Sequence, residues 1–329
     1  MAIYKFYNIQ LLPVDNKEYS EVGADGYCKL FESLGRQTEV TKEQQAKLSS
    51  IAVKMRGGMF FAPFSSSVRG YPAGDGQKKI VHGYFLKFDN VNALIDTDSG
   101  EVQYRSKGNT SSRRVEFEFA FDPYMHILAI QHKPELPTSQ PLIDALDKIL
   151  GYHAVKLFKD HSLEITELTS AASVIEFLNL PKKGYKSYSG YVTFSNSEDY
   201  DADLEGYLKS SVEKEKELKE KNIAQWKVIY KCFKSSLMSD IPDDAKVQMM
   251  LATKYGNAEA RYKNNDNEEV KYQMENFPVR EKLGKYKEGI LNRIIEIKKL
   301  IDKANEKTKV AKNALLENKR LLEKNNEDN

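Results

Sequence analysis

The sequence VEFEFAF at residues 115–121 is the stretch that decides the fold class. Apolar side chains occupy every second position from Val115 to Phe121, and Glu116 and Glu118 stand between them. This period of two is typical of a strand with one face buried and the other in water, as antiparallel sheets allow. We therefore expect a half-buried antiparallel strand whose glutamates lie on its solvated face.

Strand patterns continue on both sides of this segment. Residues 80–88 and 125–131 predict neighbouring strands, and residues 92–104 predict a strand pair that bends at Asp98, Ser99 and Gly100. The amino-terminal residues 3–14 also alternate and are interrupted by Pro13. Together these segments predict a central antiparallel meander.

Helical patterns flank the predicted sheet. Residues 26–35 and 41–55 precede it, and residues 141–150 and 173–180 follow it. The fold class predicted is therefore α+β, mainly antiparallel sheet with packed helices, rather than a parallel α/β enzyme core.

One segment between the first helices and the sheet has a different composition. Residues 57–76 are rich in Gly, Pro and Ser, yet they also contain Phe60, Phe61, Phe64 and Tyr71. A disordered linker rarely carries so many aromatic residues. We expect an ordered, partly packed loop.

The second half of the chain predicts a smaller region. A helix at 244–255 precedes a hairpin formed by residues 258–263 and 268–273. The domain organisation predicted is an α+β domain at 1–196, a helix-plus-hairpin region at 197–280 that packs on it, and a long charged helix at 281–329.

The carboxy-terminal segment has the pattern of a coiled coil. The seam residues, spaced alternately by four and three, are Ile290, Ile294, Ile297, Ile301, Ala304, Thr308, Ala311, Leu315, Asn318 and Leu322. The apolar members, Ile290, Ile294, Ile297, Ile301, Leu315 and Leu322, are the candidate oligomerisation residues. We expect residues 285–322 to bind a second copy or a partner protein; the alternative is that this helix folds back on its own domain.

Composition excludes several classes of protein. The 329 residues carry a formal net charge of only +2, so no global basic field attracts nucleic acid or membranes. Two distant cysteines, Cys28 and Cys232, predict free thiols in a reducing compartment. No apolar run approaches the roughly 18 residues that span a bilayer. We expect a cytoplasmic protein without membrane contact.

No catalytic, metal or cofactor motif stands out. His126 and His132 fall on one face of a predicted strand but about 20 Å apart, too far to share a metal. Residues 70–79 lack the spacing of a phosphate-binding loop. We therefore predict no metal and no cofactor. An enzyme of the nuclease-toxin kind would need a site built from dispersed residues such as His126, His132, Asp122 and Arg114.

Basic residues cluster around the predicted sheet. They are Arg56, Arg69, Lys78, Lys79, Arg105, Lys107, Arg113 and Arg114. Phe64, Tyr71 and Tyr104 are interleaved with them, and cations beside aromatic rings on a β-platform suit RNA or single-stranded DNA. The alternative is a solvated hairpin tip whose charges pair with nearby acidic residues.

The amino-terminal strand at residues 4–9 (YKFYNI) and the helix–Gly–strand–turn–strand–Pro block at residues 247–278 carry a resemblance. Together with the central sheet, they resemble an uncharacterised bacterial family known as a domain of unknown function. The resemblance extends over residues 1–280, with the terminal helix as an addition. It implies an association with mobile elements and phage defence, and it offers no catalytic residues.

Three hypotheses for function follow. The first is a bacterial anti-phage defence protein that recognises nucleic acid or a phage component through residues 56–79 and 104–114 and assembles through its last helix. The second is the nuclease-type toxin, and the third is a non-catalytic structural or interaction subunit. Whether the chain is an enzyme stays open at this point.

Overall fold

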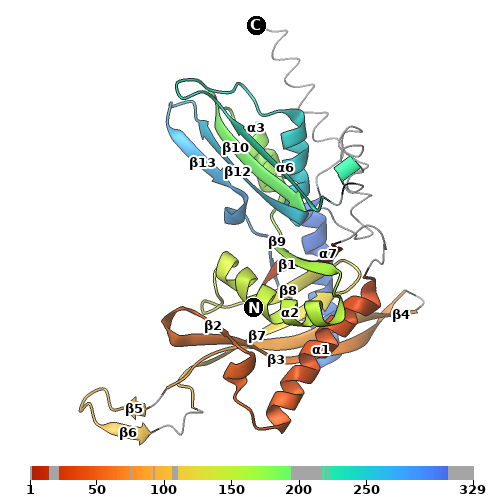
Figure 1. The fold of residues 1–329 in the computed structure, drawn as a ribbon, viewed down its shortest axis with the longest axis vertical. Helices are drawn as coiled ribbons and strands as arrows, with labels where there is room; N and C mark the ends of the chain where they lie inside the picture. The colour runs from red at the N-terminus through yellow and green to blue at the C-terminus, as the bar shows by residue number, and fades with distance from the viewer. Residues whose placement is uncertain are drawn as a thin grey trace.

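The computed structural model describes residues 2–14, 22–74, 76–91, 93–105, 110–193, 217–218, 221 and 223–309 (Figure 1). These residues form two larger antiparallel sheets and a small two-stranded one, with five α-helices. The predicted α+β composition therefore agrees with the structure, but the predicted long carboxy-terminal coiled-coil helix is wrong. None of the described helices combines the length and the apolar character that a bilayer crossing needs.

The larger sheet has eight strands in the order β14-β1-β8-β7-β4-β3-β2, with β9 also paired to β1. Their bounds are β1 Ile3–Pro13, β2 Val53–Lys54, β3 Met59–Ala73, β4 Gly76–Asp89, β7 Arg114–Asp122, β8 Ile127–His132, β9 His161–Glu167 and β14 Arg280–Lys282. All pairings are antiparallel. The strand that contains VEFEFAF, β7, lies in the middle of the sheet, as its pattern predicts.

The expectation of a loop at residues 57–76 is wrong, because β3 and β4 form one long hairpin there. Its pairing extends from Met59 opposite Asp89 to Ala73 opposite Gly76. A β-bulge between Pro63 and Ser65 accommodates the proline. The high Gly and Ser content of this strand hides its register, which is set by the neighbouring strand and the helix packed on it.

Helices α1 (Ala24–Glu43) and α2 (Ser139–Leu157) pack on one face of the larger sheet. The phenylalanines of β7 point to this face, and the rings of Phe31 and Phe121 stack with centroids 4.6 Å apart. Helix α1 passes through Gly35, where a Cβ atom would lie 2.2 Å from the carbonyl oxygen of Ser66. The glycine that suggested a helix end in the sequence instead permits close approach of α1 to β3.

Helix α7 (Ile290–Thr308) covers the opposite face of the larger sheet. It is 19 residues long, and its seam residues Ile294, Ile297 and Ile301 are no more than 1% exposed because they pack against strands of their own chain. An apolar stripe fits a sheet as well as a second helix, so the pattern did not identify its partner. Ile290 is half exposed, and Leu315 and Leu322 lie outside the described residues.

The second sheet has four strands in the order β11-β10-β12-β13. Their bounds are β10 Gly184–Thr193, β11 Gln225–Lys231, β12 Gly256–Lys263 and β13 Glu269–Gln273. Helices α3 (Ala171–Asn179) and α6 (Asp243–Tyr255) pack on one face of this sheet, around a core that includes Tyr188 and Met249. Side chains on its other face are exposed or half-buried. The helices and the sheet therefore form a two-layer unit, whose ribbon is seen in Figure 1.

The remaining elements are short. They are the strand pair β5 (Ala93–Ile95) and β6 (Val102–Arg105), and the 3-10 helices η1 (Leu48–Ile51), η2 (Arg56–Gly58) and η3 (Met274–Asn276). After β13 the chain returns to the larger sheet through β14 and α7. The domain boundaries at residues 196 and 280 stay a prediction.

Candidate functional site

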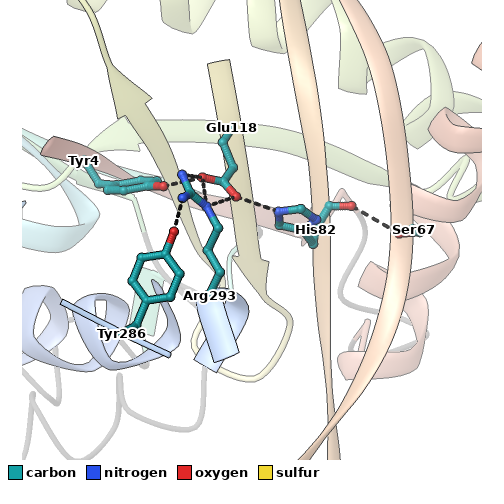
Figure 2. Close-up of polar contacts among 6 residues, drawn as sticks. All are labelled: Tyr4, Ser67, His82, Glu118, Tyr286 and Arg293. Carbon is teal, nitrogen blue, oxygen red and sulfur yellow. Dashed lines mark hydrogen bonds and ion pairs between the residues drawn. The ribbon is translucent and has the colours of Figure 1, made fainter. Parts of the chain in front are cut away.

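An extensive buried polar network surrounds Glu118, in the middle of β7 (Figure 2). Its carboxylate accepts hydrogen bonds from the Tyr4 hydroxyl at 2.5 Å and from His82 Nε2 at 3.0 Å. Arg293 of α7 donates from Nε and a terminal nitrogen at 2.7 and 2.6 Å, and also donates to the Tyr286 hydroxyl. Glu118 is only 1% exposed, so the expectation that it lies on a solvated face is wrong.

The network keeps Glu118 ionised. Burial alone raises the pKa of this carboxyl group, but hydrogen bonds from His82, Arg293 and Tyr4 outweigh that effect and lower the pKa to about 2. The hydrogen bond to Glu118 in turn raises the pKa of Arg293. Because both carboxylate oxygens are engaged by donors, this glutamate is poorly placed to accept a proton from a substrate near neutral pH.

A second ion pair fixes α7 to the same sheet. The Lys298 ammonium lies 2.8 Å from Asp122 Oδ2, and both side chains are largely buried. The other oxygen of Asp122 accepts the backbone N–H groups of Tyr124 and Met125 at 2.8 and 3.1 Å. Asp122 and Glu118 therefore anchor α7 in the folded protein.

The residues of the hypothetical nuclease site do not converge. Arg114 and Asp122 lie at opposite ends of β7, roughly 26 Å apart at 3.3 Å per residue. His126 lies in the following turn, with its ring 4.2 Å from that of Tyr27, whereas His132 ends β8. Within the described residues, no three His, Cys, Asp or Glu side chains are grouped so that they could hold a metal ion.

The predicted basic residues fall into two groups at opposite ends of the β3–β4 hairpin. Beside the turn lie Arg69, Lys78 and Lys79, and at the far end lie Arg56, Arg113 and Arg114. About ten residues of strand separate the groups, a distance of roughly 33 Å. Arg105 is exposed on the separate β6 strand, and Lys107 lies outside the described residues.

Several of these cations already have partners. Lys79 forms an exposed ion pair with Asp25 at 2.7 Å, and Lys78 lies 4.9 Å from the centroid of the Tyr124 ring. Arg114 pairs with Glu116 and also lies 5.2 Å from the centroid of the Phe64 ring. Exposed ion pairs of this kind contribute little energy, so they leave the cations available to a stronger anion.

The open face of the second sheet is a basic surface that sequence reasoning missed. Register brings Lys231, Ser187, Arg261 and Lys271 into one row across β11, β10, β12 and β13. Outward-facing residues of β11 continue the surface with Lys227 and Ile229, and Phe233 follows two residues beyond Lys231. The available signal was the alternation of residues 227, 229 and 231 with Trp226, Val228 and Tyr230, but two lysines four residues apart also fit one face of a helix.

The fold and its surfaces define an α+β protein with two larger antiparallel sheets. One is sandwiched between helices, and the other is open and basic on one face. The chain belongs to the DUF4747 family, a domain of unknown function, whose pattern matches residues 4–302. The match includes most of α7, so this helix is not an addition to the family domain. No curated protein matches the chain.

Proposed function

We propose that this DUF4747 protein binds single-stranded nucleic acid on the open face of the β11-β10-β12-β13 sheet. The observation that carries the proposal is the row of Lys231, Ser187, Arg261 and Lys271 across four adjacent strands. Its three cations and one hydroxyl are the donor types that contact phosphate and sugar groups.

Charge on this face favours an anionic ligand. Lys271 and Arg261 pair with Glu259 and Glu269 at 2.8 and 3.7 Å, but these ion pairs are half exposed and therefore weak. Lys227 and Lys231 on β11 are exposed, and neither has an acidic partner in the described part of the chain. The β11 side of the sheet is accordingly the stronger site for phosphate.

Apolar side chains accompany these lysines. Ile229, between Lys227 and Lys231, is 54% exposed, and Phe233 is 88% exposed. An unpaired base that stacks on an exposed aromatic ring contributes about 1–3 kcal/mol, so Phe233 offers a stacking surface beside these lysines. Single strands are favoured over duplexes because only unpaired bases present their faces to such a ring.

The experiment is a fluorescence anisotropy titration with labelled single-stranded RNA, single-stranded DNA and duplex. The double variant Lys227→Glu/Lys231→Glu is expected to weaken single-strand binding at least 10-fold, and Phe233→Ala to weaken it several-fold. The control Lys156→Glu/Lys159→Glu makes the same charge change on two exposed residues, Lys156 within α2 and Lys159 just after it. It is expected to bind like wild type. Equal binding by wild type and Lys227→Glu/Lys231→Glu would refute the proposal.

The basic groups predicted from the sequence give the competing surface. Converting Arg105, Arg113 and Arg114 to Glu tests it in the same titration. Loss of binding in that triple variant alone would place the contact on the loops instead of the open sheet. A role in phage defence, which the resemblance implies, and assembly through residues 285–322 both stay predictions.

A further inference from the structure

A cavity of about 360 Å³ lies where the two sheets meet. Helix α2 and the strand β9 form one wall, and β10, β12 and the segment after β13 contribute the other residues. Five carboxylates line it: Asp144, Asp147, Glu164, Glu167 and Glu275. None of the described residues that line the cavity is basic.

The carboxylates oppose one another's ionisation. Burial and the neighbouring Asp144 raise the pKa of Asp147, and burial and Asp147 raise the pKa of Glu164. Like charges that share a cavity repel, and a bound cation relieves both that repulsion and the cost of burial. Binding of a cation in this cavity is therefore expected to be favourable, because it relieves the repulsion between the carboxylates.

One lining residue, Glu167, has a buried polar atom that a bound cation could contact. The Glu167 side chain is 8% exposed; its Oε1 accepts from Lys5 at 2.9 Å, but its Oε2 has no partner among the described residues. Gln10 pairs with Glu164 across β1 and β9, so both side chains project from the same face of the sheet. Both amide atoms of Gln10 also lack a partner in the described structure, but Gln10 does not itself line the cavity, so the lining atom that awaits a partner is Glu167 Oε2.

The shape and lining of the site favour an organic cation over a metal ion. No three carboxylates or histidines of the described residues are grouped closely enough to hold a metal ion. The acidic groups are instead spread over α2, β9 and the segment after β13, with Ile143, Leu163 and Pro278 among them. A flexible chain with several ammonium groups separated by methylene segments matches this alternation of charged and apolar lining.

We propose that this cavity binds an aliphatic polyamine, with its ammonium groups held by Asp147, Glu164 and Glu167 and its methylene segments on Ile143 and Leu163. The ligand touches both sheets, because Tyr191 of β10 and Asn257 of β12 line the same cavity. Tyr191 lies opposite Lys227 in the pairing of β10 with β11, so the cavity adjoins the cationic face proposed for nucleic acid. The test of polyamine binding does not depend on that function.

Calorimetric titration and thermal unfolding of the full chain with spermidine test the proposal. Wild type is expected to show saturable binding and a ligand-dependent rise in Tm. The variant Asp147→Asn/Glu164→Gln removes two charges that make no described hydrogen bond or ion pair, so it is expected to fold. Because repulsion is relieved, its Tm without ligand is expected to be higher than that of wild type, while its affinity for spermidine falls at least 10-fold.

Matched controls separate a specific site from general charge effects. Glu39→Gln/Glu43→Gln makes the same charge change on exposed positions of α1 and is expected to bind spermidine like wild type. Mg²⁺ at equal ionic strength is expected to give no saturable heat. The proposal is overturned if Asp147→Asn/Glu164→Gln binds spermidine as wild type does, if Mg²⁺ reproduces the effect, or if a lysine-rich peptide binds the cavity more tightly than spermidine.

Discussion

At the scale of single residues, Glu118 shows how a charge is kept inside the protein. Its pKa of about 2 is below the ordinary glutamate value of 4.5, so its ionised form stabilises the folded state above the unfolded pKa. That contribution, about 3 kcal/mol, is lost as the pH falls from about 5 to 2. We expect urea unfolding of wild type to lose about 3 kcal/mol more over this range than Glu118→Gln does.

Arg293 offers the complementary control. Replacing it with Met leaves the Glu118 carboxylate buried without its cation, and breaking such a pair costs about 3–5 kcal/mol near neutral pH. Combining Glu118→Gln with Arg293→Met is expected to cost less than the sum of the single changes. Additive effects, or an identical pH profile for wild type and Glu118→Gln, would contradict the interpretation that this pair anchors α7.

At the scale of elements, two helix glycines provide a matched comparison. A Cβ on Gly35 would lie 2.2 Å from the Ser66 carbonyl oxygen, whereas a Cβ on Gly151 in α2 meets nothing nearer than 4.0 Å. We expect Gly35→Ala to lower the free energy of unfolding by about 1–3 kcal/mol through steric strain, and Gly151→Ala to raise it by about 0.5–1 kcal/mol through helix propensity. Thermal and urea unfolding measure both; stabilisation by Gly35→Ala would contradict the close packing of α1 on β3.

The elements also show what the sequence could and could not predict. The alternation at residues 115–121 placed a strand correctly, because a period of two needs no knowledge of distant residues. It could not show that Glu118 is buried, because its partner Arg293 is 175 residues away. The seam of α7 likewise revealed an apolar stripe, but an apolar stripe does not specify whether a helix or a sheet covers it.

The basic surfaces of the two larger sheets could be predicted only in part, because they too depend on residues that are distant in the sequence. Residue type identified cations beside aromatic rings, but their distance depends on strand register, which separated Arg69 from Arg113 by the length of the hairpin. The row that joins Lys231 to Arg261 and Lys271 arises from pairing among four strands, and no local pattern contains it.

At the scale of the whole molecule, α7 is part of the core. Its buried side chains Ile294, Ile297, Leu300 and Ile301 contribute about 2 kcal/mol each, a total comparable to the stability of an entire domain. We expect residues 1–284 to lose cooperative thermal unfolding, and residues 1–309, which retain every described contact of α7, to keep it. A folded 1–284 fragment that had lost only self-association would contradict this account and support the assembly prediction.

Binding of single-stranded nucleic acid to the open face of the β11-β10-β12-β13 sheet is tested most directly by photo-crosslinking. A single-stranded RNA that contains 4-thiouridine is crosslinked to the full chain, and the attached peptides are located by mass spectrometry. We predict crosslinks concentrated at residues 225–234, with fewer in Lys227→Glu/Lys231→Glu. Crosslinks confined to residues 56–79 and 104–114, or none above those to a control protein, would contradict nucleic-acid binding on this sheet.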